Sequence, residues 1–431
     1  MALNVLSQLL AGCWPDPDGG PPPDVSVRSV AIERTLDGRE AALIAALGFG
    51  PALAVVSDPA TRMALGQRVE RALSGFGTVH PVVLGDNPHA DDSTVAALCR
   101  ETATADALIA VGSGTINDLC KYAAARMGKP YAVFATAPSM NGYASTNAAI
   151  THNGHKMSLA AAAPAGIFMD LQVLAAAPAR MIRAGLGDSL CRPTAQADWL
   201  LSHRLRGTPY RTAPFALLAD DEKTLFAAPE ALLAGDLEAM RVLARTLVLS
   251  GFGMTLCGGS YPASQGEHLI SHFIDMFALP GRLAFFHGEQ VGVAALSMAR
   301  IQERLMAGGP PRPRPTAVDA GDLRRRFGDE IGASCWREFE SKRLDGALAA
   351  AIGERLADTW DSICAEIRAV TIPSRLLADI LARAGAPATP EAIGLTAEFY
   401  RGAVAGARYL RDRYTFLDLA DDAGCLEGSW S

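Results

Sequence analysis

The chain has 431 residues, of which 49% are apolar and 20% are charged, and its formal net charge is −7. A chain of this length exceeds the size at which one hydrophobic core keeps growing, so we expect two domains. The basic residues are scattered, which argues against a nucleic-acid surface. No window offers the roughly twenty uninterrupted apolar residues of a membrane span, so we expect no membrane insertion.

The eight cysteines are widely and irregularly spaced, and none forms a CxxC pair. We expect reduced, mostly buried thiols rather than disulfides, because a chain this long can form a stable fold without covalent cross-links. The apolar segment from Met1 to Ala11 lacks the basic residues of a signal peptide, and an acidic, Pro- and Gly-rich stretch follows it. These features predict a cytoplasmic protein.

The first part of the chain alternates short strand-like runs with helical patterns. Residues 52–56 and 79–84 predict two strands with a helix over 60–76 between them. Residues 108–111 predict a third strand, which leads through a glycine turn into a helix ending near Arg126, and residues 131–135 predict a fourth. This rhythm is typical of a parallel sheet with crossover helices.

From about Pro178 the sequence becomes rich in Ala, Leu, Arg and Glu. Residues 198–205, 237–250 and 352–369 predict helices, and β-branched runs become rare. We therefore place a domain boundary after Ala177, with an α/β domain over 1–177 and an all-α domain over 178–431. Residues 308–315 are too Pro-rich for a helix and predict an exposed loop.

The predicted third strand runs directly into a glycine turn. Glycine lets the backbone turn without a Cβ atom, and the first N–H groups of the following helix can bind a pyrophosphate. The residues that we expect to bind a dinucleotide here are Gly112, Ser113, Gly114, Thr115, Asn117 and Asp118. An ordinary turn remains the alternative, because Asn117 stands where the dinucleotide fingerprint has a third glycine.

Two further segments favour a dinucleotide. Asp58 closes the first predicted strand, where a carboxylate can bind the hydroxyls of an adenosine ribose and would disfavour NADP. Asp58 could equally cap a helix, since Pro59 follows it. The loop after the fourth strand offers Thr136, Ser139 and Ser145 at the sheet edge where ligands bind in open α/β proteins, although it could be an ordinary polar connection.

Three segments of the second half carry potential metal ligands. Asp188 follows what we predict to be a glycine turn at the head of a helix, His268 and His272 lie four residues apart, and His287 stands between a Phe pair and a glycine. One carboxylate with two imidazoles forms a common open site for a divalent metal. The alternatives are a helix cap for Asp188, surface positions for His268 and His272, and a core position for His287. Spacing alone does not show whether these residues meet.

Taken in order, these motifs resemble the iron-containing alcohol dehydrogenase and dehydroquinate synthase-like superfamily, and within it the glycerol-1-phosphate dehydrogenases. The matching segments are residues 112–118, 136–139, 142–145, 187–188, 262–268 and 287–290. The resemblance runs from about Ala54 to Ala295 and is weaker over the remainder. It implies a Rossmann-like N-terminal domain, a helical C-terminal domain, and a cleft between them that holds cofactor and metal.

The resemblance also implies an activity, namely the metal-dependent, NAD(P)H-linked reduction of dihydroxyacetone phosphate to sn-glycerol 1-phosphate. Its metal ligands would be Asp188, His268 and His287, with zinc expected and iron or nickel as alternatives. The family usually has an aspartate facing the substrate where this chain has Asn141. An amide keeps the hydrogen-bonding shape of a carboxylate but cannot accept a proton, which leaves the substrate open. Candidate phosphate-binding residues are Lys156, Arg183 and His272.

Three other functions remain open at this point. The chain could oxidise or reduce another polyol or alcohol. It could be a carbocycle-forming lyase of the dehydroquinate synthase type, although residues 136–190 hold only Lys156, Arg180 and Arg183 to bind the phosphate. It could also be a non-catalytic binding protein, which the retained metal ligands argue against. We expect a small phosphorylated substrate, no nucleic-acid partner and a homo-oligomer.

Overall fold

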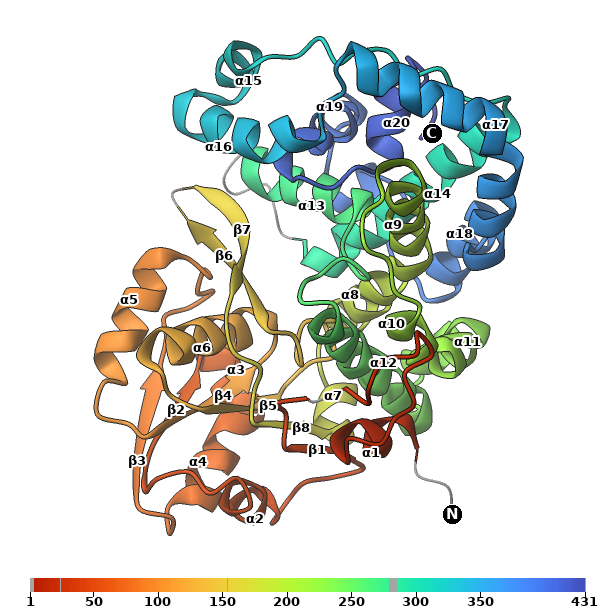
Figure 1. Cartoon of the computed structure of the whole chain (residues 1–431). Coiled ribbons are helices and arrows are strands. Elements are labelled where there is room, and N and C mark those ends of the chain that lie inside the picture. Colours follow the sequence, from red (N-terminus) through yellow and green to blue (C-terminus); the bar gives the residue numbers. More distant parts are fainter. Residues whose placement is uncertain (1–3, 24, 153, 279–284, 431) are drawn as a thin grey trace. The chain divides into compact units, whose positions relative to one another are not determined.

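The computed structural model describes residues 4–23, 25–152, 154–278 and 285–430 (Figure 1). By their internal contacts the residues form two compact units. Unit 1 comprises residues 1–189 and 211–260, and unit 2 comprises residues 190–210 and 261–431. This division differs from the predicted boundary after Ala177, because several helices beyond that residue pack on the α/β part. Helix α12 (Leu237–Leu256), for example, packs against strand β1 (Ser29–Glu33) and helix α8 (Ala179–Ser189).

Unit 1 contains a parallel six-stranded sheet with the order β1-β8-β5-β4-β2-β3. Its strands are β1, β2 (Ala52–Ser57), β3 (Thr78–Val83), β4 (Ala107–Gly112), β5 (Tyr131–Ala135) and β8 (Gly166–Asp170). The four predicted strands are confirmed to within one residue at each end. All residues of β4, β5 and β8 are buried, as continuous apolar runs covered on both faces should be.

Helices cover both faces of this sheet. Leu53, Val55 and Ile109 face a core that also contains Ile44 and Val69 of helices α2 (Glu40–Ala45) and α4 (Gln67–Leu73). The alternate residues of the same strands point to the other face, where α6 (Gly114–Met127) packs against β2, β4 and β5 and also against α5 (Asp92–Glu101). The helix predicted over 60–76 is divided into α3 (Pro59–Thr61), a π-helical turn η1 (Arg62–Gly66) and α4.

Two further parts of unit 1 lie beside the sheet. Strands β6 (Asn147–His152) and β7 (His155–Ala160) form an antiparallel hairpin that stands apart from the six strands (Figure 1). Helix α12 is the one described helix that is long and apolar enough to cross a membrane. Most of it is buried, and it packs against α7 (Leu171–Ala175), α8, α10 (Ala213–Ala216) and α11 (Ala219–Ala227). It is therefore a core helix of unit 1.

Within its described residues, unit 2 has helices as its only regular structure. They are α9 (Arg192–Arg206), α13 (Gly266–Phe277), α14 (His287–Ala307), α15 (Ala320–Phe327), α16 (Asp329–Phe339), η3 (Glu340–Lys342), α17 (Gly346–Val370), α18 (Ser374–Arg383), η4 (Glu391–Ile393), α19 (Ala397–Ala407), η5 (Arg408–Leu410) and α20 (Phe416–Asp422). One apolar core joins most of them. Residues 308–315 lack regular structure, which confirms the predicted Pro-rich loop.

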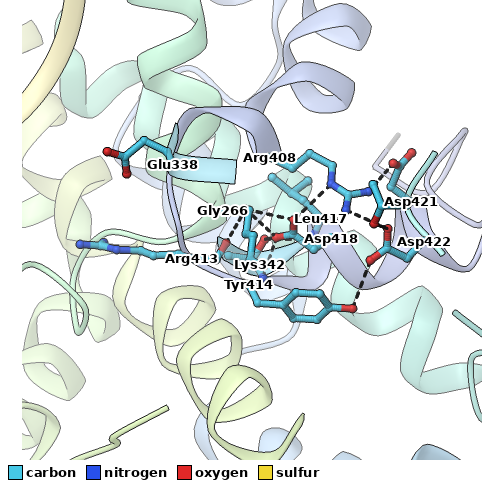
Figure 2. Close-up of polar contacts among 12 residues, drawn as sticks. Gly266, Glu338, Lys342, Arg408, Arg413, Tyr414, Leu417, Asp418, Asp421 and Asp422 are labelled. Carbon is cyan, nitrogen blue, oxygen red and sulfur yellow. Dashed lines mark hydrogen bonds and ion pairs between the residues drawn. The ribbon is translucent and has the colours of Figure 1, made fainter. Parts of the chain in front are cut away.

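A buried charge network fixes α20 inside unit 2. Figure 2 shows the Arg408 guanidinium among three carboxylates of α20: Asp418, Asp421 and Asp422. Its Nε lies 3.1 Å from Asp418 and its Nη2 lies 2.8 Å from Asp422, while Lys342 Nζ lies 3.0 Å from Asp418. Buried charges are tolerated when each has a well-placed partner, and this network gives α20 a fixed position.

Candidate active site

The glycine turn of unit 1 has the predicted form. Strand β4 ends at Gly112 and α6 begins at Gly114, with Ser113 between them giving no side-chain cap to the first turn. A Cβ atom on Gly112 would lie 2.5 Å from Ile116 Cβ, so the turn has no room for a side chain. The amide of Thr136 donates to the Gly112 carbonyl at 3.1 Å. The turn can therefore present its N–H groups to an anion beside the segment that follows β5.

Asn117 and Asp118 take part in a polar cluster beneath this turn. Asn117 Nδ2 donates to Asp118 Oδ1 at 3.2 Å, and the Tyr131 hydroxyl donates to Asn117 Oδ1 at 3.4 Å. The amide of Ala149 donates to Asp118 Oδ2 at 3.1 Å. Burial raises the pKa of Asp118, and the nearby Lys121 opposes that shift. Both side chains thus connect α6 to the neighbouring strands, and their contact with a cofactor stays a prediction.

Asp58 caps helix α3. Its Oδ1 accepts a hydrogen bond from the Thr61 amide at 2.8 Å, and Thr61 Oγ1 accepts one from the Asp58 amide at 3.0 Å. This reciprocal pair is a capping box, so the helix-cap reading of Asp58 is confirmed. The residue also lies at the carboxyl end of β2, next to β4 in the sheet. Its predicted contact with a ribose is a separate role that remains a prediction.

The segment between β5 and β6, residues 136–146, is here called the β5–β6 loop. Four of its predicted site residues are less than one-tenth exposed, namely Thr136, Ser139, Asn141 and Ser145. The Tyr143 hydroxyl donates to the Ala137 carbonyl at 2.7 Å, and Thr255 Oγ1 of α12 donates to the Ala144 carbonyl at 3.0 Å. The loop is therefore held in one conformation by contacts inside unit 1.

Asp188 lies at the same end of unit 1. Its carboxylate is 1% exposed, and its Oδ2 accepts a hydrogen bond from the Asn141 amide at 2.7 Å. The prediction of a glycine turn at a helix start is wrong here, because Gly185 and Gly187 lie inside α8 and Asp188 occupies its last turn. The cap reading fails for the same reason. A Cβ atom on Gly185 would overlap the carbonyl oxygen of Pro138, so the glycine lets α8 approach the β5–β6 loop.

Unit 2 brings three histidines together. The ring centroids of His268 and His287 are 5.0 Å apart, and that of His272 lies 6.3 Å and 6.2 Å from them. His268 and His272 are buried on α13, and His287 begins α14. The surface alternative for His268 and His272 is therefore wrong. The other two phosphate candidates, Lys156 on β7 and Arg183 on α8, belong to unit 1.

Neighbouring side chains fix the rings of His268 and His287. His268 Nδ1 lies 2.9 Å from Glu267 Oε1, and His287 Nδ1 lies 3.1 Å from Ser271 Oγ, which itself donates to Gln290 Oε1 at 2.8 Å. A carboxylate can only accept, and a hydroxyl that already donates must accept, so both Nδ1 atoms carry the proton. The lone pair of each neutral ring is then on Nε2. Metal-ligating histidines commonly have such partners on their other nitrogen.

Asp198 of α9 supports the start of α13. Its carboxylate is fully buried and accepts hydrogen bonds from the amides of Gly266 and Phe416, both at 3.0 Å, and from Gln302 Nε2 at 3.2 Å. Burial raises the pKa of Asp198 to about 8, and the nearby Glu267 contributes to that shift. The sequence pattern predicted no role for Asp198, Glu267 or Ser271. A carboxylate among the apolar residues of α9 was the available signal.

Comparison with known proteins identifies relatives over most of the chain. A family model described as iron-containing alcohol dehydrogenase matches residues 31–178. A glycerol-1-phosphate dehydrogenase [NAD(P)+] of Bacillus licheniformis is 30% identical over 381 residues, which cover 87% of this chain and 84% of the relative. The enzyme of the same name from Pyrococcus furiosus is 35% identical over 64% of this chain and 80% of the relative.

Solved structures show the same fold at lower identity. NADH-dependent butanol dehydrogenase A of Thermotoga maritima has a TM-score of 0.58 at 14% identity, covering 95% of this chain and 98% of its own. Sulfoacetaldehyde reductase of Bifidobacterium kashiwanohense, solved with NAD+, has a TM-score of 0.58 at 15% identity, covering 94% and 96%. The predicted fold class of a parallel α/β sheet followed by a large helical part is thereby confirmed. The chain belongs to the glycerol-1-phosphate dehydrogenase family, within the iron-containing alcohol dehydrogenase-like proteins.

Proposed function

We propose that this protein is a metal-dependent dehydrogenase that uses NADH or NADPH to reduce dihydroxyacetone phosphate to sn-glycerol 1-phosphate. Relatives that span most of the chain are named glycerol-1-phosphate dehydrogenase [NAD(P)+]. The observation that carries the proposal is the pair formed by the buried His268 and the half-buried His287, whose Nδ1 atoms both have fixed partners. All eight cysteines are free thiols, which supports a reducing, cytoplasmic location.

We assign the metal to Asp188, His268 and His287. The donor set fits a divalent transition metal, since it combines one carboxylate with two imidazoles whose lone pairs are on Nε2. Zinc suits these donors, and iron or nickel would also be accepted. When bound, the metal supplies Lewis-acid stabilisation of negative charge on a substrate oxygen. The protein contributes the buried surroundings and the Glu267 and Ser271 contacts that hold both rings.

The remaining site residues act on the cofactor and the substrate. The N–H groups of the glycine turn would bind the pyrophosphate, and Thr136, Ser139 and Ser145 would border the nicotinamide. When bound, the reduced nicotinamide would supply a hydride for the carbonyl carbon, and the carbonyl oxygen would gain a proton to give the secondary alcohol. Asn141 can orient a substrate hydroxyl but cannot exchange its proton. Loss of NADH absorbance with dihydroxyacetone phosphate tests the activity. A lyase would release phosphate without net NADH consumption.

Asp58 gives a prediction about the choice of cofactor. We expect a lower KM for NADH than for NADPH, because a carboxylate beside the ribose repels the 2′-phosphate. Since Asp58 also caps α3, Asp58→Asn is the sharper substitution: it keeps a capping side chain and removes the charge. The KM for NADPH should fall by about tenfold, on the scale of one close charge pair near the surface. Equal KM values in the wild-type enzyme would show that Asp58 has no ribose role.

Asn141 gives a prediction about the substrate. Asn141→Asp should keep or raise turnover of dihydroxyacetone phosphate, because the new carboxylate can exchange protons with a substrate hydroxyl. The backbone contact with Asp188 does not depend on this side chain. Asn141→Leu is the matched control, since it keeps the size, removes the polar group and should lower turnover. Steady-state rates on phosphorylated and unphosphorylated ketones measure both effects. If neither wild type nor Asn141→Asp reduces dihydroxyacetone phosphate, the substrate assignment is wrong.

A further inference from the structure

Lys121 occupies a core position of α6. Its side chain is fully buried, and its helix neighbours Leu119, Cys120 and Ala124 are apolar and equally buried. Burial lowers the pKa of Lys121 to about 8, although the nearby Asp118 carboxylate raises it. An ammonium group inside a protein is costly unless its N–H groups are satisfied. The contacts of this amine therefore indicate its role.

The Lys121 amine reaches out of α6 to the next segments of the chain. Its Nζ donates to the Gly142 carbonyl at 2.6 Å, to Ser145 Oγ at 3.0 Å and to the Asn147 carbonyl at 3.1 Å. Three acceptors match the three N–H bonds of an ammonium. Asp118 Oδ1 lies 3.8 Å away and compensates the charge. One side chain thus joins α6 to the β5–β6 loop and to the first residue of β6.

We propose that Lys121 is a positioning residue that holds the β5–β6 loop in its cofactor-binding conformation before NAD(P)H arrives. The inference rests on the proposed function, in which the glycine turn and this loop both bind the cofactor. Helix α6 begins at that turn with Gly114, and the loop carries Ser139 and Asn141. Lys121 fixes these two segments relative to each other without touching the cofactor itself.

Losing the amine would loosen one part of the loop. The carbonyls of Gly142 and Asn147 would each lose their charged donor, and the single proton of the Ser145 hydroxyl, which lies 2.9 Å and 3.0 Å from them, could serve only one of the two. The other anchors, from Tyr143 to Ala137 and from Thr255 to Ala144, do not involve Lys121. The loop would therefore sample more conformations rather than unfold. NADH binding would then have to reorder the loop. The apparent affinity for NADH falls in proportion to the fraction of molecules whose loop is in the binding-competent conformation.

The test is Lys121→Met in the full-length, metal-loaded enzyme. We expect the Kd for NADH, measured by fluorescence titration without substrate, to rise about tenfold, as when a competent conformation falls to a tenth of the population. The matched control is Lys129→Met. Lys129 follows the same helix and donates to two carbonyls, of Thr102 at 3.0 Å and Ala103 at 2.6 Å, but contacts no loop residue through them. Its loss should leave the Kd unchanged.

The pH dependence of NADH binding provides a second readout. As the pH rises from about 7 to about 9 the ammonium loses a proton, and a neutral amine has two N–H bonds for three acceptors. The Kd of the wild type should rise over this range, and that of Lys121→Met should not. Asp118 is the charged group against Lys121, and Tyr131 on β5, Tyr143 in the loop and Lys156 of β7 each interact with Asp118. Burial raises the pKa of both tyrosines, so they stay neutral.

Lys121→Gln serves as the conservative variant, because it retains N–H donors without the charge. It should bind NADH with intermediate affinity and without the pH dependence, and it replaces Lys121→Met if that variant fails to fold. A Kd equal to that of the wild type in the Met and Gln variants, with a lowered melting temperature, would overturn the inference and leave a purely structural lysine. If the wild type binds NADH tightly but reduces no dihydroxyacetone phosphate, the proposed function fails while this inference stands.

Discussion

His287→Ala should lose the bound metal and lower the reduction of dihydroxyacetone phosphate by on the order of a thousandfold, since a metal supplies several kcal/mol of charge stabilisation. The same result is expected for Asp188→Ala and His268→Ala. Metal content after desalting, measured by mass spectrometry, and NADH oxidation rates are the readouts. The fold should persist, because none of the three side chains belongs to the apolar core of unit 2 or to the core of unit 1 under α2 and α4.

The matched control for the histidine variants is His203→Ala. His203 lies on α9 of unit 2, and its Nδ1 lies 2.7 Å from the Thr208 carbonyl near the surface. His203→Ala therefore removes an imidazole that has a similar Nδ1 contact but lies outside the proposed metal site. Metal content and rate should match the wild type. Full metal content and full turnover in His287→Ala would instead show that the ligand assignment is wrong.

Three of the four strands predicted from the sequence, namely β2, β4 and β5, are buried along most of their length, whereas β3 is mostly exposed. Runs such as Ala107–Gly112 and Tyr131–Ala135 are apolar throughout and end in turn residues, so their pattern is unambiguous. Strand β1 was missed because Ser29–Glu33 is short and only partly apolar, and β8 because it follows an Ala- and Pro-rich stretch. The packing of α12 could not be predicted from the sequence either. Its pattern predicts a helix, but only contacts show that this helix packs on unit 1.

At the candidate site, the metal-ligand residue types could be predicted from the sequence, but the residues that hold them in place could not. Histidines four residues apart on a helix are visible in a sequence, and so is the glycine turn at Gly112. By contrast, Lys121 finds its acceptors 21 to 26 residues away, and Asp198 caps α13 from 68 residues before it. Contacts over such separations follow from the tertiary fold. The remaining signal was a charged residue on the buried face of a helix, as at Lys121 and Asp198.

Gly185→Ala should damage stability and activity together. The added Cβ atom would overlap the carbonyl oxygen of Pro138, and neither backbone can rotate away as a flexible side chain would. Helix α8 or the β5–β6 loop must then shift. We expect the free energy of unfolding to fall by about 3 kcal/mol, at the upper end of the usual cost of overpacking a core. Chemical denaturation followed by circular dichroism measures this loss.

The expected loss of activity follows from what the two segments carry. Asp188 lies one turn after Gly185 on α8, and its Oδ2 accepts the amide of Asn141 from the loop. Separating the segments breaks this contact and displaces both residues. A displacement of about 1 Å in a catalytic site costs on the order of 100-fold in rate. We therefore expect a loss of that size in turnover of the variant that remains folded.

Gly402→Ala is the control that isolates the close approach from the effect of a helical glycine. Gly402 lies inside α19, and nothing stands within 4 Å of the position that its Cβ would take. This substitution should raise the free energy of unfolding by about 0.5–1 kcal/mol, because alanine loses less backbone entropy in a helix than glycine does. Its turnover should match the wild type. If Gly185→Ala were as stable and as active as Gly402→Ala, α8 would have room for a side chain beside Pro138. The close contact of α8 with the loop would then not be the cause of the position of Asp188 against Asn141.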